Sequence, residues 1–336
     1  MGNARVNNII TVGASAGGLT AVSTLLATIP ANIDAAVFIV IHLGRDANTN
    51  NVLTLLRRKS KMKVVIPADG TFIERGVAYL APVDFHMMLN GETITISKGA
   101  KENHWRPSID VLFRTAAAAY DSCVIGIVLT GLLDDGTSGM VAIKSAGGIC
   151  IVQDPREAEF PDMPNNVVHA VDVDYRASIS EIGYILSDIY TRGKCEVANV
   201  SPKLKREAEI TIRMATNSDA NSTLGNATTL TCPDCGGVLT EIEEDGNFRY
   251  RCFTGHVFSE KVLQDENLLK TEETLWVAIR MMEERRNFML NMSKQTSDYP
   301  VLKAEREQRA GELKVHIDRL KQILEELGTA DGKNTS

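Results

Sequence analysis

A hydroxyl, an imidazole and a carboxyl group each follow a short apolar run that is typical of a buried strand. Ser15 comes after the first such run, His42 ends the second, and the adjacent acids Asp134 and Asp135 follow a later one. The carboxyl ends of parallel strands meet at one edge of a sheet, so these side chains are expected to lie close together. A serine nucleophile needs a base that takes its proton and an acid that orients the base, so the pattern indicates acyl-transfer chemistry.

The residues around Ser15 read Gly13-Ala14-Ser15-Ala16-Gly17-Gly18 and match the G-x-S-x-G pattern of a nucleophile elbow. Glycines allow the sharp turn, and the following helix supplies unpaired N–H groups for an oxyanion. A glycine-rich turn can instead cradle phosphate, but the spacing is not G-x-G-x-x-G and no acid follows the second strand. The elbow is preferred, and a phosphate-binding or plain tight turn is the alternative.

A lone histidine such as His42 is more often a structural or surface imidazole than a base. Combined with a serine at the end of a neighbouring strand, it could serve as the general base, because its ordinary pKa near 6.5 suits proton transfer at neutral pH. One of Asp134 and Asp135 could accept its N–H, while the other would cap a helix or lie in a solvated turn. The order Ser15, His42, Asp135 differs from the Ser, Asp, His order of α/β-hydrolases, which disfavours a standard hydrolase of that fold.

From Asn8 to about Tyr190, short apolar runs alternate with amphipathic stretches, which predicts a doubly wound, mostly parallel α/β sheet with helices on both faces. The predicted strands are Ile9–Val12, Ala36–Ile41, Lys63–Ile66, Val124–Leu129 and Ile149–Gln153. The predicted helices are Leu19–Ile29, Val52–Lys59, Ile109–Tyr120, Ser138–Ala146 and Ile179–Tyr190. Asn90-Gly91 between two strand-like runs predicts an antiparallel hairpin.

Together these motifs resemble the catalytic domain of the CheB-type protein-glutamate methylesterases of chemotaxis, over about residues 8 to 190. The resemblance rests on the serine motif, on Ile41-His42, on Arg106-Pro107-Ser108-Ile109-Asp110-Val111-Leu112-Phe113, and on Leu129-Thr130-Gly131 through Asp135-Gly136 and Gly139-Met140. It implies hydrolysis of glutamate methyl esters on methylated chemoreceptors, with glutamine deamidation as a related activity and without a catalytic cofactor.

The resemblance implies that Ser15 attacks the ester, His42 moves its proton and Asp135 orients His42, with Asp134 where the family commonly has Asn. The backbone N–H groups of Ala16 and Leu132 would stabilise the oxyanion. The sequence departs from the family pattern at Ala16, where Thr is usual, at Leu43-Gly44, where Met-Pro is usual, and at Leu133, where Gly is common. The family's usual N-terminal receiver domain is not expected, because the esterase core begins almost at Met1.

Three further residues have more than one interpretation. Arg106, just before a predicted helix, could clamp substrate carboxylates or serve as a structural hydrogen-bond donor. Cys123 and Cys150 adjoin predicted strands and are interpreted as small core residues, in preference to nucleophiles.

Cys232-Pro233-Asp234-Cys235 and Cys252-Phe253-Thr254-Gly255-His256 form a C-x2-C knuckle and a C-x3-H pair. Cys232, Cys235, Cys252 and His256 can supply three thiolates and one imidazole to a tetrahedral, structural Zn²⁺ site. The alternatives are four unpaired residues in a flexible tail and a redox pair; the latter is disfavoured because Cys232 does not begin a helix after a strand.

The length of 336 residues and the apolar fraction of 44% predict about two globular domains. The net charge of −7 argues against nucleic acid as the main partner, because binding to a phosphate backbone depends on basic surface. The longest apolar run, Ala35–Ile41, is too short to span a membrane, and no signal peptide is recognisable, so a cytoplasmic protein is expected.

Four regions are predicted: a catalytic domain (1–192), a flexible linker (193–230), a zinc-ribbon-like module (231–262) and an α-helical hairpin (263–328). The linker is rich in small polar and charged residues, and the hairpin has apolar residues at helical spacing on either side of Tyr299-Pro300. The hairpin is expected to bind a partner or to mediate self-association. The rival functions are a non-catalytic scaffold that keeps the fold and, more weakly, a nucleotide-binding oxidoreductase.

Overall fold

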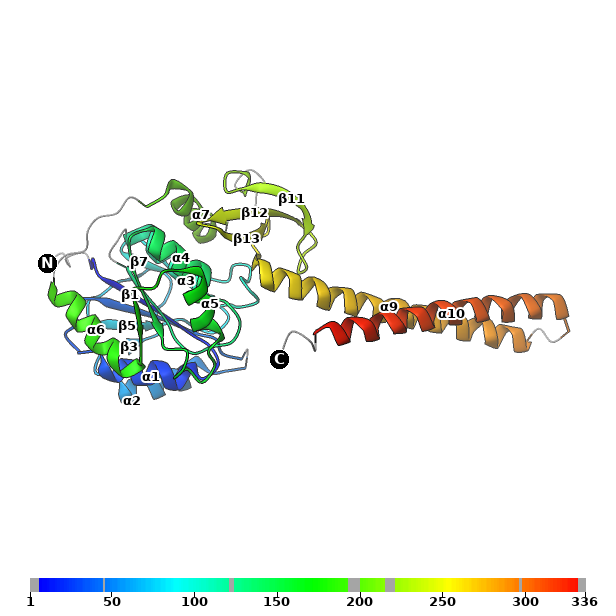
Figure 1. Ribbon diagram of the computed structural model, residues 1–336, viewed down its shortest axis with the longest axis horizontal. Coiled ribbons are helices and arrows are strands. Elements are labelled where there is room, and N and C mark those ends of the chain that lie inside the picture. Colours follow the sequence, from blue (N-terminus) through cyan, green and yellow to red (C-terminus); the bar gives the residue numbers. More distant parts are fainter. Residues whose placement is uncertain are drawn as a thin grey trace. The chain divides into compact units, whose positions relative to one another are not determined.

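The computed structural model describes residues 6–44, 46–120, 124–192, 200–214, 221–295 and 298–331. The chain divides into two compact units, Met1–Glu260 and Lys261–Ser336. The first unit holds the sheets and the second is a pair of helices (Figure 1).

A seven-stranded parallel sheet in the order β10-β9-β8-β1-β2-β5-β3 forms the centre of the first unit. Its strands are β1 (Ile9–Ala14), β2 (Ala36–Ile41), β3 (Lys63–Val65), β5 (Val77–Leu80), β8 (Val124–Val128), β9 (Ile149–Gln153) and β10 (Tyr175–Ala177). The predicted parallel α/β class is confirmed, and β5 and β10 are additions to the predicted strands. The strand order reverses at β1, which is where open α/β sheets place their ligands.

Helices cover both faces of this sheet (Figure 1). One face carries α1 (Gly18–Thr28), α2 (Thr49–Lys59) and α6 (Ile179–Arg192), and the other carries α3 (Ile109–Tyr120), α4 (Thr137–Ser145) and α5 (Asp162–Ala170). The side chains of β2 alternate between the two cores: Phe38 and Val40 lie in the core with α3, and Ile39 and Ile41 lie in the core with α1. Both faces are therefore apolar, as a buried parallel sheet requires.

A small antiparallel sheet in the order β4-β7-β6 lies beside the main one. It consists of β4 (Thr71–Phe72), β6 (His86–Asn90) and β7 (Thr93–Ser97). β6 pairs with β7 from Asn90↔Thr93 to His86↔Ser97, and Gly91 has a positive φ of 61°. The predicted Asn-Gly hairpin is confirmed.

The region after the catalytic domain contains a helix, α7 (Pro202–Ile212), and an antiparallel sheet of β11 (Asn226–Thr231), β12 (Val238–Glu244), β13 (Asn247–Cys252) and β14 (Val257–Ser259), which we call the ribbon. The prediction of a flexible linker over 193–230 is wrong for α7 and the start of the ribbon, while residues 193–199 and 215–220 lie outside the described residues. Ser201 caps α7 by accepting a hydrogen bond from Leu204 N, and Leu204 and Ala208 are buried.

A buried ion-pair cluster explains why α7 is ordered. Glu207 of α7 pairs with Arg249 of β13 at 3.0 Å and lies 3.5 Å from Arg114 of α3, whose guanidinium also pairs with Glu102 at 2.6 Å. All four side chains are buried, so α7 and the ribbon pack against the catalytic domain within one unit. A charged stretch that looked solvated in the sequence is therefore partly internal.

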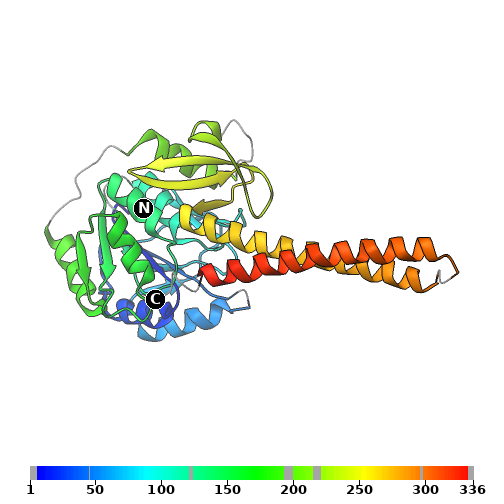
Figure 2. The same ribbon diagram turned by 45° about the vertical axis from the view of Figure 1, so that its right-hand side comes forward.

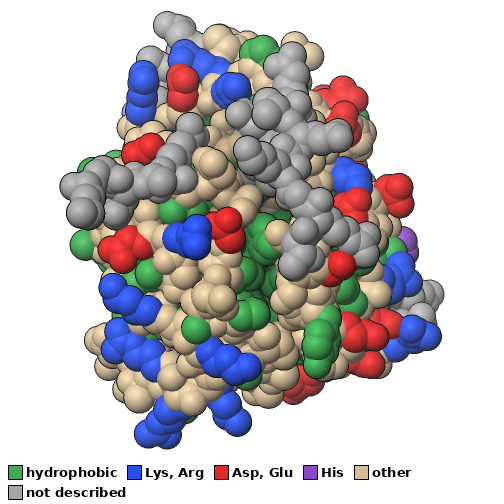
Figure 3. Space-filling view, turned by 90° about the vertical axis from the view of Figure 1, so that its left-hand side faces the viewer, with side chains coloured by type: hydrophobic (Ala, Val, Ile, Leu, Met, Phe, Trp, Pro, Cys, Tyr) green, Lys and Arg blue, Asp and Glu red, His purple; other side chains and the backbone are tan. Residues whose placement is uncertain are grey.

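The second unit is an antiparallel pair of long helices, α9 (Glu260–Gln295) and α10 (Pro300–Asp331) (Figure 2). Ile279 and Ile317 are buried, and Lys321 pairs with Glu283 of the other helix at 2.7 Å. Within the described residues, no helix is both long enough and apolar enough to cross a membrane. On the face of the first unit that Figure 3 draws, both acidic and basic side chains are visible.

Candidate active site

Ser15 and His42 lie at neighbouring strand ends on the same side of the sheet. β1 and β2 are paired up to Ala14↔Ile41, and His42 N donates to Ala14 O at 2.9 Å, so the next residues of the two strands are Ser15 and His42. Adjacent strands lie about 4.8 Å apart. Ala14 and Ile41 belong to the core with α1, so the alternation along each strand directs Ser15 and His42 toward α3.

The turn that carries Ser15 is held against the loop after β8. Ser15 N donates to Thr130 O at 3.0 Å, and a Cβ added to Gly131 would lie 2.7 Å from Ser15 Cβ. Gly17 takes a left-handed φ of 71° just before α1, which a side chain would strain. The carboxylate of Glu159 lies beside Gly17, which disfavours the alternative of a phosphate-binding turn.

Asp135 is the acid that contacts His42. His42 Nε2 lies 2.8 Å from Asp135 Oδ2, and both side chains are buried. Asp134 instead accepts a hydrogen bond from Ser259 Oγ, so the structure distinguishes two acids that the sequence left as alternatives.

The Asp135 carboxylate lies at the N-terminus of α3, whose first residues donate to it. Ile109 N donates at 2.7 Å, Asp110 N at 3.2 Å and Ser108 Oγ at 2.9 Å. These donors and the positive end of the helix dipole favour the charged carboxylate. The start of the predicted helix Ile109–Tyr120 therefore also binds and orients the Asp135 carboxylate.

Burial governs the proton affinities of the pair. Burial lowers the pKa of His42 to about 3, so its imidazole is neutral at pH 7. Burial raises the pKa of Asp135 to about 7, although the N–H groups of Ile109 and Asp110 and the Ser108 hydroxyl lower it. His42 Nδ1 is buried and has no hydrogen-bond partner in the described part of the chain. A neutral imidazole with one unengaged nitrogen can accept a proton.

Trp105 contacts this pair and was not identified from the sequence. Its ring stacks on the His42 imidazole with centroids 4.0 Å apart and an angle of 6° between the planes. Such a stack fixes the ring and favours an imidazolium when it forms. No sequence signal distinguishes Trp105 from an ordinary aromatic residue, whereas Ser108, next to a predicted helix start, could have been singled out as a cap.

The predicted oxyanion donors belong to the two segments that meet at Ser15, the turn after β1 and the loop after β8. Among the described residues, no acceptor takes the backbone N–H of Ala16 or Leu132. Ala16 follows Ser15 directly, and Leu132 follows Gly131, which packs against Ser15. Leu133 has a positive φ of 67°, which is a left-handed backbone conformation. Glycine, which is common at this position in the family that the sequence resembles, adopts it without strain, whereas for other residues it costs about 1–2 kcal/mol.

Arg106 is engaged within the protein. Its guanidinium donates to Asp84 Oδ1 at 2.6 Å and to Gly99 O at 2.7 Å. These contacts favour the structural interpretation of Arg106 over a clamp for substrate carboxylates. Cys150 is buried, in keeping with a core thiol, and Cys123 lies outside the described residues.

The four predicted metal ligands converge at one end of the ribbon. The ligand atoms of Cys232, Cys235, Cys252 and His256 all lie within 4.8 Å of one another. Cys235 Sγ and Cys252 Sγ are 3.6 Å apart, and His256 Nδ1 is 3.6 Å from Cys252 Sγ and 3.7 Å from Cys232 Sγ. Thiolates at 2.3 Å from a tetrahedral Zn²⁺ are about 3.8 Å apart, so this cluster could hold such an ion.

Comparisons with known proteins give matches to one protein family. A protein-family model described as CheB methylesterase matches residues 10–186. A putative protein-glutamate methylesterase/protein-glutamine glutaminase of Leptospira interrogans is 37% identical over 174 residues, which are 52% of this chain and 90% of the relative. A protein-glutamate methylesterase/protein-glutamine glutaminase of Methanosarcina mazei is 38% identical over 171 residues, 48% of this chain and 46% of the relative.

A solved structure also matches part of this chain. The crystal structure of the Thermotoga maritima CheB methylesterase catalytic domain superimposes with a TM-score of 0.53 and 29% sequence identity. The match covers 55% of this chain and 98% of the solved chain. The family model ends at residue 186, so the ribbon and the helical pair lie beyond the residues that it matches.

Proposed function

Because this chain belongs to the CheB methylesterase family, we propose that it hydrolyses glutamate methyl esters on methylated chemoreceptors, and that it deamidates receptor glutamines by the same chemistry. The observation that carries this proposal is the buried hydrogen bond between His42 and Asp135, next to Ser15 at the edge of the sheet. This arrangement supplies a nucleophile, a base and an orienting acid.

In the proposed mechanism, Ser15 Oγ attacks the ester carbonyl and His42 Nδ1 takes the hydroxyl proton. Nδ1 is assigned this role because Nε2 is engaged by Asp135. The carboxylate stabilises the imidazolium as it forms, and the stacked Trp105 holds the ring in place. The base is thus oriented from two sides before substrate binds.

The N–H groups of Ala16 and Leu132 would donate to the tetrahedral oxyanion. His42 then returns its proton to the departing methoxy group, so methanol leaves and an acyl-enzyme remains on Ser15. Water attacks this ester with His42 again as the base, and the products are a glutamate carboxylate and free Ser15. With glutamine as the substrate, the leaving group is ammonia.

The direct experiment is methanol release from methylated receptor by the full chain. Ser15→Ala is expected to abolish release while circular dichroism stays unchanged. Asp135→Asn is expected to lower kcat by about 10⁴-fold, as loss of the orienting acid does in serine hydrolases. Asp134→Asn, which leaves the bond to His42 intact, is the matched control and should retain activity within about tenfold.

The rival function, a non-catalytic scaffold with this fold, predicts a different result. If wild-type protein binds methylated receptor but releases no methanol, the esterase proposal is wrong and the scaffold is favoured. The exposed Leu132 and Leu133 beside Ser15 would then be contact residues for a bound protein.

We also propose that the ribbon cluster binds one structural Zn²⁺. The four side chains leave no open position, and His256 Nε2 lies 3.8 Å from Asp234 Oδ2, the kind of outer contact that orients a ligand imidazole. Purified protein is expected to contain one Zn²⁺ per chain by mass spectrometry. Cys232→Ser should lose the metal, whereas Cys150→Ser, at a buried thiol far along the chain, should keep it.

The helical pair is proposed to mediate self-association. The face of α9 opposite its seam with α10 exposes five hydrophobic side chains at helical spacing, namely Leu269, Trp276, Val277, Met281 and Phe288. We call this set the outer face. An antiparallel contact centred on Met282 would place Trp276 opposite Phe288, and Arg280 opposite Glu284, of a second copy. The face is complementary to itself, so a second copy is the partner it fits.

A further inference from the structure

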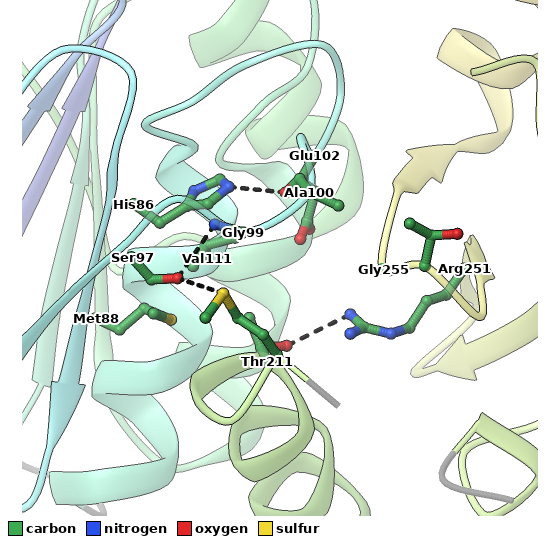
Figure 4. Close-up of a pocket in the computed structure, with 12 residues that line it drawn as sticks. His86, Met88, Ser97, Gly99, Ala100, Glu102, Val111, Thr211, Arg251 and Gly255 are labelled. Atoms are coloured by element: carbon green, nitrogen blue, oxygen red, sulfur yellow. Dashed lines mark hydrogen bonds between the residues drawn. The ribbon is translucent and has the colours of Figure 1, made fainter. Parts of the chain in front are cut away.

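The ribbon contacts the loop between β7 and α3, residues 98–108, which we call the β7–α3 loop. This loop leads to the pair formed by His42 and Asp135, and its contact with the ribbon begins beside His256, one of the proposed metal ligands. β14 starts immediately after His256, and its Val257 N donates to Lys101 O at 3.4 Å. Asn103 N donates in turn to Val257 O at 2.9 Å. β14 therefore pairs with residues of this loop as one strand does with another. In the adjacent pocket, Ala100 and Glu102 of the loop face Arg251 and Gly255 of the ribbon (Figure 4).

The Asn103 side chain connects β14 to the residues around Asp135. It is buried, its Oδ1 accepts from Ser259 N at 2.8 Å, and its Nδ2 donates to Asp110 Oδ2 at 3.2 Å. Asp110 donates its own N–H to Asp135 at 3.2 Å, and its Oδ1 accepts from Gly136 N at 3.0 Å. Two hydrogen bonds thus separate the ribbon from a residue that contacts the catalytic carboxylate.

The loop that pairs with β14 also supplies other contacts to the pair. Trp105 stacks on His42, and Ser108 Oγ donates to Asp135. A shift of β14 would therefore be transmitted to both members of the pair. A displacement of about 1 Å at a catalytic group can lower the rate about 10²-fold.

We propose, on the basis of the proposed function, that the metal-closed ribbon holds the His42–Asp135 pair in its working geometry through β14 and Asn103. Asn103 is thus a positioning residue for ester hydrolysis, and the ribbon is part of the enzyme's active machinery. The strands of the ribbon bury the apolar side chains of Leu239, Ile242, Val257 and Phe258, which is a small core for such a module. The metal would therefore supply much of its rigidity.

The first test compares two contacts between the ribbon and the catalytic domain. Asn103→Ala removes the link to Asp110 and is expected to lower kcat by at least about tenfold with KM within about twofold. Ser145→Ala removes the hydrogen bond from α4 to Asp245 in the β12–β13 turn, which leads to no catalytic residue. It serves as the matched control and should retain wild-type kcat. Equal kcat values for the two variants would overturn the proposal.

The second test does not depend on esterase activity. The chain has two tryptophans, so Trp276→Phe leaves Trp105 as the only one. Removal of Zn²⁺ from this variant by a chelator is expected to shift the Trp105 emission, and Asn103→Ala should shift it in the same direction with the metal bound. An unchanged emission after metal loss would overturn the proposal. If wild-type protein releases no methanol, the proposed function fails, and this emission measurement alone decides whether the ribbon positions the pair.

Discussion

The contacts of His42 leave one nitrogen available for catalysis. In the familiar serine triad, Nδ1 donates to the aspartate and Nε2 faces the serine. Here Nε2 is bonded to Asp135, and the buried Nδ1 has no partner among the described residues. Because a triad is defined by geometry and roles, the reversed ring can perform the same proton transfer. The strand alternation directs Ser15 and His42 to one side of the sheet, which supports the proposed role of Nδ1 as the base.

The raised pKa of Asp135 predicts the acid side of the pH profile. An aspartate with a pKa of about 7 is protonated as the pH falls through that value, so kcat/KM should decline there instead of near pH 4. Ser108→Ala removes a donor to the charged carboxylate, which raises the pKa further and should move the decline to higher pH by about one unit. The measurement is kcat/KM against pH for both proteins. A decline that moves to lower pH in the variant would contradict this assignment.

The sequence was sufficient to predict that Ser15 and His42 lie at strand ends on the same edge of the sheet, because each of them follows a recognisable apolar run. It was insufficient for the choice between Asp134 and Asp135, which depends on how the loop after β8 meets the start of α3. Trp105 could not be predicted either. Its stacking on His42 depends on the path of the loop between β7 and α3, and this loop contacts β14, which is distant in the sequence. The hydrogen bond between Ser259 N and Asn103 Oδ1, for example, joins residues that are 156 positions apart.

At the scale of elements, local pattern predicted the long apolar strands and failed where tertiary contacts decide. β2, β9 and α3 begin and end at the predicted residues, because burial on both faces leaves a continuous apolar signal. α7 was missed because its composition resembles a solvated linker. Its order depends on Glu207, whose partners Arg114 and Arg249 lie in distant parts of the sequence.

Glu207 is predicted to be critical for docking of α7 and the ribbon. Burial raises its pKa, but the guanidinium groups of Arg249 and Arg114 lower it by more, so the net shift is downward and Glu207 is charged at neutral pH. Glu207→Gln leaves buried guanidinium groups without this carboxylate and should reduce the free energy of unfolding by about 3–5 kcal/mol.

The control for Glu207→Gln is Glu209→Gln on the same helix. Glu209 forms an exposed pair with Arg206 at 3.4 Å, so its loss should cost less than about 1 kcal/mol. Urea denaturation of both variants gives the two values. Equal values would show that the buried cluster does not hold α7 in place.

At the scale of the whole molecule, the described chain combines a unit of the methylesterase fold with a pair of long helices, and helix α9 of this pair carries the outer face. A two-helix pair buries only one seam, so the five hydrophobic side chains of the outer face stay exposed in a single chain. Trp276 and Phe288 are 53% and 65% exposed, more than scattered surface hydrophobic residues require. Two copies joined through this face would form a four-helix arrangement, with apolar contacts along both sides of α9.

The outer face therefore predicts a concentration-dependent dimer. The stretch from Leu269 to Phe288 is about 30 Å long at 1.5 Å per residue, which suits a weak to standard interface. Trp276→Glu should shift the full chain to monomer in analytical ultracentrifugation, because it buries a charge opposite Phe288 of the second copy. Val301→Glu, at an exposed hydrophobic residue of α10 outside the outer face, is the control and should leave the dimer intact.

Charge reversal tests the antiparallel register itself. Arg280→Glu places like charges opposite Glu284 of the second copy and should weaken the dimer, while Arg280→Glu combined with Glu284→Arg restores opposite charges and should recover it. Arg280 and Glu284 also form an ion pair within α9, with their charged atoms 3.5 Å apart. The double variant keeps opposite charges at these two positions, so its helix stability, measured by circular dichroism, should be similar to that of the wild type. A wild-type chain that stays monomeric at every concentration, or a double variant that remains as weak as Arg280→Glu, would rule out this contact.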